Sequence, residues 1–441
     1  MSAATETLTD VLPARRGRWI DDWRPEDPAF WAGGGAKVAR RNLIFSVLAE
    51  HIGFSVWTMW SVLVLFLGPA YHVDAAGKFL LTAVPALVGS VLRLPYTLAV
   101  ATFGGRNWTI ISAALLLLPT IPAALLIKPG VSYTTLMILA AITGVGGGNF
   151  ASSMTNINAF YPQRLKGWAL GLNAGGGNIG VAAIQLVGLG VLAWAGAGHP
   201  RLVAGVYIPV VVIAALCAAL FMDNLSTAKN DKRAIRDVSR EPHTWIMSFL
   251  YIGTFGSFIG FGFAFGQVLQ VQFKPEFRTA IDAAYLTFLG PLLGSLIRPV
   301  GGWLADRVGG ALVTFWNFVA MAAAAGTVLM ASRGHSLPLF LVGFIGLFVF
   351  SGVGNGSTYK MIPAIFRDRP DGQRLAGALI GVAGAIGAFG GVLVNVAFRQ
   401  SFLTYKTGDA AYLAFIIFYA LCFLVTWAVY LRPSARRLPG V

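Results

Sequence analysis

The stretch LVGSVLRLPYTLAVATFGGRN, residues 87–107, contains a single arginine inside a long apolar segment, Arg93. The pattern returns as LGSLIRPVGGWLADR at residues 293–307, with Arg298 in the matching place. A charge within a membrane helix costs about 3 kcal/mol or more, so such a residue is first interpreted as functional. Two such charges, one in each half of a repeated chain, predict one anion site between the halves.

The composition is that of an all-α polytopic membrane protein. The chain has 441 residues, of which 56% are hydrophobic and only 12% are charged. A bilayer span requires about 20 apolar residues. We expect about twelve spans, at residues 42–68, 77–102, 107–127, 132–158, 167–194, 202–222, 243–270, 280–303, 311–332, 337–366, 375–398 and 410–431.

The net charge of +15 is distributed as in a membrane protein rather than as in a nucleic-acid-binding protein. With both termini placed in the cytoplasm, 22 of the 33 Lys and Arg residues fall on the cytoplasmic side. This asymmetry is the positive-inside rule. It predicts a multi-pass protein of the cytoplasmic (inner) membrane whose partner is the lipid bilayer and not nucleic acid.

Repeated glycine motifs divide the chain into two halves. Arg93 and Gly104 recur 205 positions later as Arg298 and Gly309. Further glycines match at offsets of 208 and 210 residues, and parallel six-helix repeats are typical of the major facilitator architecture. The predicted domains are a cytoplasmic segment 1–41, an N-terminal half 42–222, a cytoplasmic linker 223–242, a C-terminal half 243–431 and a cytoplasmic tail 432–441.

Two segments outside the spans have characteristic composition. Residues 1–22 are expected to be disordered, and WRPEDPAFW (residues 23–31) is expected to lie against the cytoplasmic surface. The loop GGWLADRVGG (residues 301–310) resembles the cytoplasmic loop signature of the major facilitator superfamily. Asp306 and Arg307 are therefore predicted to act in gating and stability.

The two arginines are expected at the same depth. Each lies eleven residues from the following loop, which corresponds to about 16 Å along a helix, close to half of the hydrocarbon thickness of about 30 Å. Guanidinium is planar and always charged, and its fork of donors matches a flat oxyanion. The alternative, a structural arginine paired with a buried acid, is weakened because deep acids are nearly absent.

The exception among the acids is Glu50, which is followed by His51 in the first span. Either residue is a candidate for proton coupling. The alternative is a counter-ion, or a polar group packed against another helix. Because adjacent helical residues point in different directions, both are not expected to face one cavity.

Polar and aromatic residues near the depth of the arginines complete the predicted site. Embedded asparagines need partners in lipid and could donate to an anion, whereas the glycines around them are expected to serve helix packing. No phosphate loop is indicated, since no GK[ST] motif follows. Aromatic rings could cover the faces of a flat anion. The candidates are Phe54, Phe150, Asn173, Asn178, Tyr251 and Phe255.

Three long motifs resemble those of the NarK-type nitrate/nitrite porters of the major facilitator superfamily. They are GNFASSMTNINAFYPQRLKGWALGLNAGGGNIG, TFGSFIGFGFAFGQ and GVGNGSTYKMIPAIF. WRPEDPAFW and FGGRNW also resemble that family, and the resemblance covers essentially the whole chain. It implies twelve helices, alternating access, a central site for nitrate or nitrite, and a monomer.

The resemblance also implies roles for individual residues. Arg93 and Arg298 match the family's anion-binding arginines, and Phe150 and Phe255 match the rings that sandwich the ion. Tyr251, Asn178 and Phe54 match further pocket residues, with Asn173 a less direct match. Glu50-His51 resembles the branch described as proton-coupled nitrate importers, which favours nitrate/proton symport.

Several alternatives remain open at this stage. They are nitrate/nitrite antiport, transport of another organic anion or drug by the same fold, and a polytopic sensor or intramembrane enzyme. We expect no enzyme activity, because Ser357 and His51 lie in different halves with no catalytic motif around them. No cofactor, catalytic residue or metal site is predicted.

Overall fold

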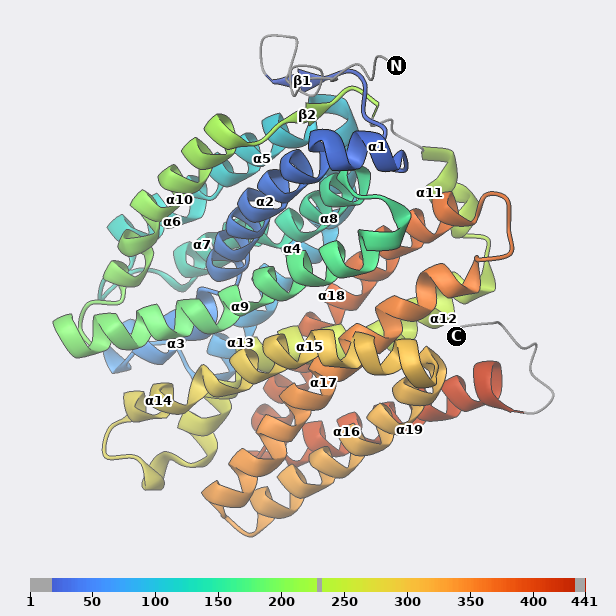
Figure 1. Cartoon of the computed structure of the whole chain (residues 1–441). Helices are drawn as coiled ribbons and strands as arrows, with labels where there is room; N and C mark the ends of the chain where they lie inside the picture. The colour runs from blue at the N-terminus through green and yellow to red at the C-terminus, as the bar shows by residue number, and fades with distance from the viewer. Residues whose placement is uncertain (1–17, 228–231, 433–440) are drawn as a thin grey trace, which may run out of the picture.

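Long helices make up both halves of the chain in the computed structural model, which describes residues 18–227, 232–432 and 441 (Figure 1). The helices of the N-terminal half are α1 (Pro28–Phe30), α2 (Ala36–Trp57), α3 (Trp60–Phe66), α4 (Ala75–Phe103), α5 (Gly105–Leu115), α6 (Leu117–Leu126), α7 (Tyr133–Thr143), α8 (Asn149–Phe160), α9 (Gln163–Ala195) and α10 (Arg201–Phe221). The helices that follow are α11 (Lys232–Val238), α12 (Pro242–Tyr251), α13 (Ser257–Gln272), α14 (Ala284–Thr287), α15 (Leu289–Val308), α16 (Gly310–Arg333), α17 (Leu337–Ile365), α18 (Gly372–Tyr405) and α19 (Asp409–Thr426).

Some of these helices join end to end into single spans. Short 3-10 or π-helical turns connect them, such as Gly144–Gly148 between α7 and α8 and Ile252–Gly256 between α12 and α13. Within the described residues, eleven helical segments, some of them single helices and some joined, are long and apolar enough to cross a membrane. The twelfth expected span is α15, which is less apolar because it contains Arg298, Asp306 and Arg307. The all-α, two-half architecture expected from the sequence is confirmed.

The first helix begins earlier than expected, at Pro28 instead of residue 42. Asp27 is its N-cap, and the Asp27 side chain accepts hydrogen bonds from the backbone N–H groups of Ala29 and Phe30. Proline at the first helical position has the φ that a helix needs and lacks an N–H that would be unpaired there. Gly34 then bends the chain with a φ of 155°. Residues 28–31 of WRPEDPAFW thus begin the helical segment that continues into the first expected span, and the expected position of WRPEDPAFW against the cytoplasmic surface stays a prediction.

The N-terminal segment is fastened to the start of the linker. Strand β1 (Trp19–Ile20) pairs in parallel with β2 (Asn224–Leu225). Beside them the fully buried carboxylate of Asp223 accepts hydrogen bonds from Arg18 Nε at 3.0 Å and Arg41 Nη2 at 2.5 Å. The expectation of disorder over residues 1–22 is thus wrong for residues 18–22, while residues 1–17 lie outside the described part of the chain.

The sequence repeat corresponds to repeated structure. Gly104 ends α4 with a φ of 88°, and Gly309 ends α15 with a φ of 95°. This left-handed region favours glycine, because other residues place a Cβ against the backbone. Arg93 and Arg298 therefore occupy equivalent positions on equivalent helices.

Other repeated glycines make equivalent contacts with the first helix of each half. A Cβ at Gly177 would collide with the Glu50 side chain, and a Cβ at Gly387 would collide with the Tyr251 ring. The glycines three residues further on, Gly180 and Gly390, lie against backbone of the same two helix segments. These matched contacts make Glu50 the counterpart of Tyr251 in the other half.

Close packing of this kind gives a stability prediction for Gly352, which lies in α17. A Cβ there would collide with the backbone carbonyl of Gly294, so Gly352→Ala should lower the melting temperature in detergent. Overpacking typically costs about 1–3 kcal/mol. Gly326, within α16, has nothing within 4 Å of an added Cβ and provides the control. Equal melting temperatures for Gly352→Ala and Gly326→Ala would contradict this account.

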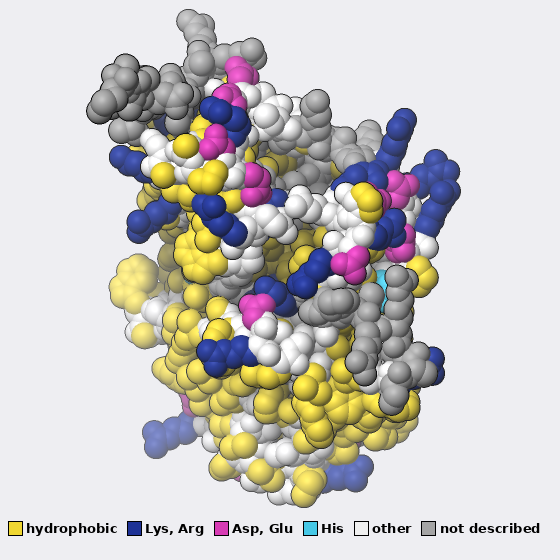
Figure 2. All heavy atoms as spheres, turned by 45° about the vertical axis from the view of Figure 1, so that its right-hand side comes forward, with side chains coloured by type: hydrophobic (Ala, Val, Ile, Leu, Met, Phe, Trp, Pro, Cys, Tyr) yellow, Lys and Arg dark blue, Asp and Glu magenta, His cyan; other side chains and the backbone are white. Residues whose placement is uncertain are grey.

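The surface divides into an apolar belt and charged ends. Side chains such as Val91 (62% exposed) and Val342 (67% exposed) lie on the belt, which Figure 2 shows in yellow next to a region rich in Lys, Arg, Asp and Glu. We name the face that bears the linker and the β1–β2 pair the linker face. Its side chains include the ion pair between Arg369 Nη1 and Glu241 Oε1, at 2.5 Å. Such a belt suits the hydrocarbon region of a bilayer.

The two halves contact each other on the face opposite the linker. Thr82 Oγ1 donates to Asn395 Oδ1 at 2.8 Å, and Gln267 Nε2 donates to the carbonyl of Ala75 at 2.6 Å. The ring of Phe79 on α4 stacks on the Phe398 ring of α18 at 5.8 Å. These contacts close the boundary between the halves at that face.

Candidate functional site

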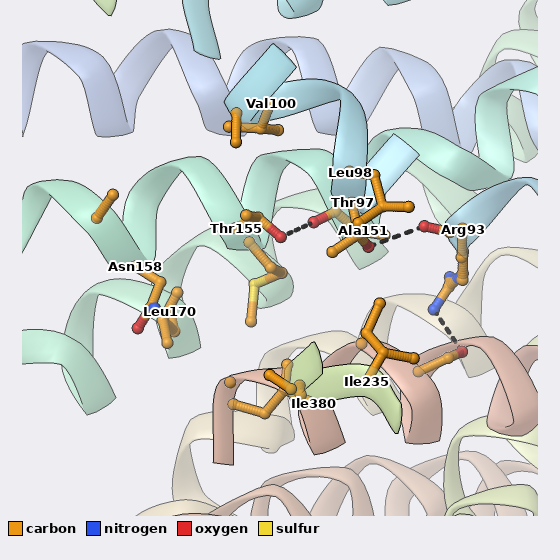
Figure 3. Close-up of a pocket in the computed structure, with 18 of the residues that line it drawn as sticks. Arg93, Thr97, Leu98, Val100, Ala151, Thr155, Asn158, Leu170, Ile235 and Ile380 are labelled. Atoms are coloured by element: carbon orange, nitrogen blue, oxygen red, sulfur yellow. Dashed lines mark hydrogen bonds between the residues drawn. The ribbon is translucent and has the colours of Figure 1, made fainter. Parts of the chain in front are cut away.

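Arg93 lies in α4 at the boundary between the halves, and its side chain is fully buried. Its Nε donates to the carbonyl of Gly147 at 3.2 Å. Its Nη1 donates to the carbonyl of Gly384 on α18 at 2.9 Å, which is the dashed line from Arg93 to the lower helix in Figure 3. Its Nη2 is buried and has no hydrogen-bond partner among the described residues. Arg93 thus touches both halves and keeps one donor nitrogen unused.

Arg298 is the equivalent residue of α15, with a side chain only 4% exposed. Its Nη2 donates to the Tyr251 hydroxyl at 3.3 Å, and its Nη1 has no partner in the described part of the chain. The hydrogen bonds found for Arg93 and Arg298 are made to carbonyl oxygens and a hydroxyl, not to a carboxylate. This pattern disfavours the alternative of two structural ion pairs.

Aromatic rings cover the guanidinium of Arg93. Its Cζ lies 4.5 Å from the Phe150 ring centroid and 4.8 Å from that of Phe255. The Phe150 and Phe255 rings are 5.7 Å apart and inclined by 28°. Tyr251 stacks on Phe255 at 5.1 Å, so the rings connect Arg93 to the residue that contacts Arg298. The structure brings all five of these predicted residues together.

Sequence reasoning missed two aromatic residues of this group. The Tyr359 ring lies 5.3 Å from Arg298 Cζ and 5.1 Å from the Tyr251 ring. The Trp57 ring lies 5.4 Å from Arg93 Cζ. Tyr359 lies in the motif GVGNGSTYKMIPAIF, and Trp57 lies in the first apolar span. The repeat offset of 208 residues pairs Phe150 with the residue next to Tyr359, so alignment of the halves would have pointed to this turn of α17.

Phe54 and Asn178 lie close to this group in different ways. The Phe54 ring packs edge-on against Phe150 at 5.9 Å, and it is fully buried. Asn178 is fully buried on α9, and neither atom of its amide has a hydrogen-bond partner within the described residues. A role for Asn178 in binding an anion stays a prediction.

Glu50 lies on α2 with its carboxylate fully buried. Its Oε2 accepts a hydrogen bond from Asn173 Nδ2 at 2.6 Å, whereas its Oε1 points toward Gly177. Asn173 also donates to Ser153 Oγ at 2.6 Å. Asn173 therefore contacts the acid rather than the arginines, and its predicted contact with the substrate stays a prediction.

His51 makes a different contact with the same neighbouring helix. Its Nδ1 lies 3.1 Å from the carbonyl oxygen of Gly176, and the residue is only partly buried. Of the two candidates for proton coupling, Glu50 is thus the one that joins a buried network of side chains.

The loop predicted to act in gating contains one ion pair and one ring contact. Asp306 Oδ1 accepts from Lys360 Nζ at 2.5 Å, and both side chains are about half exposed. Arg307 lies over the Trp303 ring at 4.0 Å. The ion pair joins α15 to α17 within one half, and a gating role for Asp306 and Arg307 stays a prediction.

A cavity of about 330 Å³ extends from Arg93 toward the linker face. Figure 3 shows Thr97, Ala151 and Thr155 on one wall and Ile380 of α18 on the other. Gln373, which is exposed, and the linker residue Ile235 also line this cavity. The cavity therefore leads from the linker side to Arg93, whose side chain stays fully buried, while Arg298 is not among the residues that line it.

Comparisons with known proteins agree with this architecture. A family model described as Major Facilitator Superfamily matches residues 47–395. The chain is 36% identical over 454 residues to the nitrate/nitrite transporter NarU of Salmonella typhimurium, covering 95% of this chain and 97% of that protein. It is 34% identical to the probable nitrate/nitrite antiporter NarK2 of Thermus thermophilus, covering 97% and 100%. A crystal structure of a D-xylose-proton symporter superimposes with a TM-score of 0.67 at 15% identity, covering 92% of this chain and 99% of that one, which supports the fold alone.

Proposed function

Because this chain belongs to the NarK-type nitrate/nitrite porter family of the major facilitator superfamily, we propose that it moves nitrate and nitrite across the membrane by alternating access. Membership also makes the chain a multi-pass membrane transporter and not an enzyme. The finer proposal is uptake of nitrate together with a proton, through the inner membrane, by a monomer with both termini in the cytoplasm.

The observation that supports anion transport most directly is the pair of buried arginines. Arg93 Nη2 and Arg298 Nη1 are buried donors without a partner among the described residues. Leaving a charged donor unpaired in a buried site is costly, and a bound anion would satisfy both. Nitrate is flat and matches a planar guanidinium fork, while aromatic rings can cover its faces.

Charge counting links Glu50 to the transport cycle. With Glu50 ionised, the empty site carries the formal charge of two arginines and one carboxylate, or +1. With nitrate bound and Glu50 protonated, the formal charge is again +1. The empty and doubly loaded sites therefore resemble each other electrostatically, whereas nitrate alone or a proton alone changes the buried charge. We propose that this similarity lets the halves rock in the empty and doubly loaded states only.

Antiport of nitrate against nitrite is the second candidate, favoured by the similarity to the probable nitrate/nitrite antiporter NarK2 of Thermus thermophilus. Symport is favoured by the buried carboxylate of Glu50 close to both arginines.

Nitrate uptake into proteoliposomes tests the proposal. One arm imposes an inward proton gradient, and the other preloads the lumen with nitrite and has no gradient. Acceleration by the proton gradient alone supports symport, and acceleration by internal nitrite alone replaces it with antiport. Absence of nitrate movement in both arms would reject nitrate as the substrate.

A further inference from the structure

A row of buried hydroxyl groups leads from Glu50 toward the linker face. Ser153 of α8 lies beside the Glu50 carboxylate, because Asn173 Nδ2 contacts both Glu50 Oε2 and Ser153 Oγ at 2.6 Å. Ser153 Oγ lies 2.9 Å from Ser46 Oγ, which is one helical turn nearer the linker face on α2. Ser153 is 7% exposed, Ser46 is 1% exposed and Glu50 is fully buried. Glu50, Ser153 and Ser46 thus form a buried polar row inside the N-terminal half, with Asn173 as the hydrogen-bonded link between Glu50 and Ser153.

Asn173 of α9 fixes the inner end of this row. Its Nδ2 donates at 2.6 Å both to Glu50 Oε2 and to Ser153 Oγ. One amide nitrogen thereby holds the carboxylate and the first hydroxyl together. Asn173 has no titratable proton, so we assign it as a positioning residue.

The row continues in line with a polar group at the linker face. Asn42 lies one further turn along α2 from Ser46, about 6 Å away along the helix axis. Its Nδ2 donates to Asp223 Oδ2 at 2.8 Å. Asp223 is paired with Arg41, whose side chain is 34% exposed. The polar stripe of α2 thus extends from the depth of Glu50 to side chains that reach solvent.

This row is separate from the cavity that reaches Arg93. Neither Glu50, Ser46 nor Asn173 lines that cavity, although Met154 of α8 does. Met154 Sδ lies 3.6 Å from Asn173 Nδ2. Its thioether therefore stands between the cavity and the amide that holds Glu50.

We propose that Ser153 and Ser46 conduct the proton between Glu50 and the linker face, while the anion passes through the cavity beside Arg93. This inference rests on the proposed symport. In one transfer the Glu50 O–H bond breaks as its proton binds Ser153 Oγ. The Ser153 proton passes to Ser46, and a water molecule that reaches Ser46 along the polar stripe of α2 takes the Ser46 proton. One proton moves and no group is oxidised or reduced.

Charged and titratable groups on the surrounding elements bear on this transfer. The charged groups near Glu50 are Arg298 of α15 and Arg93 of α4, and the titratable hydroxyl near it is that of Tyr359 of α17. His51 is adjacent on α2. The positive charges of the two arginines favour release of the proton from Glu50 once the anion has left.

The test compares Ser153→Ala with Ser152→Ala in proteoliposomes. Ser152 is the neighbouring buried serine, and its hydroxyl donates to the carbonyl of Asn149 instead. We expect Ser153→Ala to reduce proton-driven nitrate uptake about tenfold or more, as for loss of a proton-transfer group. Nitrate/nitrate exchange at equal pH should be unchanged, because exchange needs no proton release. Ser153→Thr, which keeps the hydroxyl, should restore uptake.

The outcomes separate this inference from the proposed function. If nitrate uptake by the wild type does not change when a proton gradient is imposed, both the proposed symport and the proton route are wrong. Proton-driven wild-type uptake with equal rates in Ser153→Ala and Ser152→Ala would overturn the route alone. If Ser153→Ala also loses nitrate/nitrate exchange, the Ser46→Ala variant is measured instead. A Ser46→Ala variant that keeps exchange but loses proton-driven uptake supports the proton route. Any other result for Ser46→Ala overturns the route.

Discussion

Replacing Arg93 or Arg298 by Lys is expected to abolish most nitrate transport. Arg93 uses two nitrogens on carbonyl oxygens of both halves and leaves the third unpaired. An ammonium group is a point charge that cannot make these contacts and also hold a flat anion. Hydrogen bonds to charged groups contribute about 1.5–3 kcal/mol each, so loss of one lowers uptake about 10- to 100-fold. Initial rates of nitrate uptake in proteoliposomes measure this effect.

The matched control for these variants is Arg333→Lys. Arg333 lies at the end of α16, paired with Asp409 and with a side chain 67% exposed. An exposed ion pair contributes little, so its uptake should equal that of the wild type. Wild-type uptake by both Arg93→Lys and Arg298→Lys would refute the anion site.

Replacing Glu50 by Gln is expected to remove the dependence of uptake on an imposed proton gradient while nitrate binding is retained. Gln has nearly the same shape and can still accept the hydrogen bond from Asn173, but it cannot release a proton. Uptake of the variant should be the same with and without the gradient. Isothermal titration calorimetry with nitrate checks that the site still binds.

Glu276→Gln is the control for charge removal, because Glu276 is an exposed acid in the loop after α13. It should respond to the gradient like the wild type. If Glu50→Gln keeps the gradient-driven uptake of the wild type, Glu50 has no coupling role and is instead a structural counter-ion.

The arginine pair could be predicted from sequence because the repeat and the rule on buried charge point to the same two positions. Arg93 and Arg298 each precede a glycine by eleven residues, and those glycines prove to be the left-handed ends of equivalent helices. The phenylalanine pair followed from the family resemblance. In both cases a short stretch of sequence was enough to indicate which residues lie between the two halves.

Other features depend on contacts between distant segments and left no local pattern. The pairing of Trp19 with Asn224 joins two stretches of only two residues each, which are too short to be recognised as strands in isolation. Ser153 is one serine among many in glycine-rich helices, and only the approach of α2 and α9 to α8 brings it to Ser46 and Asn173. Tyr359 likewise contacts Arg298 only after α15 and α17 pack together.

The equivalence of Glu50 and Tyr251 bears on how such transporters diverge. Both side chains emerge at the same point of a duplicated scaffold, and each faces a glycine that leaves room for it, Gly177 or Gly387. A lineage could therefore gain or lose an acid at this point by changing one codon, with the helix packing and both arginines left intact. The acid proposed to couple protons could thus be exchanged while the anion site stays intact, so position 50 is the position to compare between porters that differ in coupling.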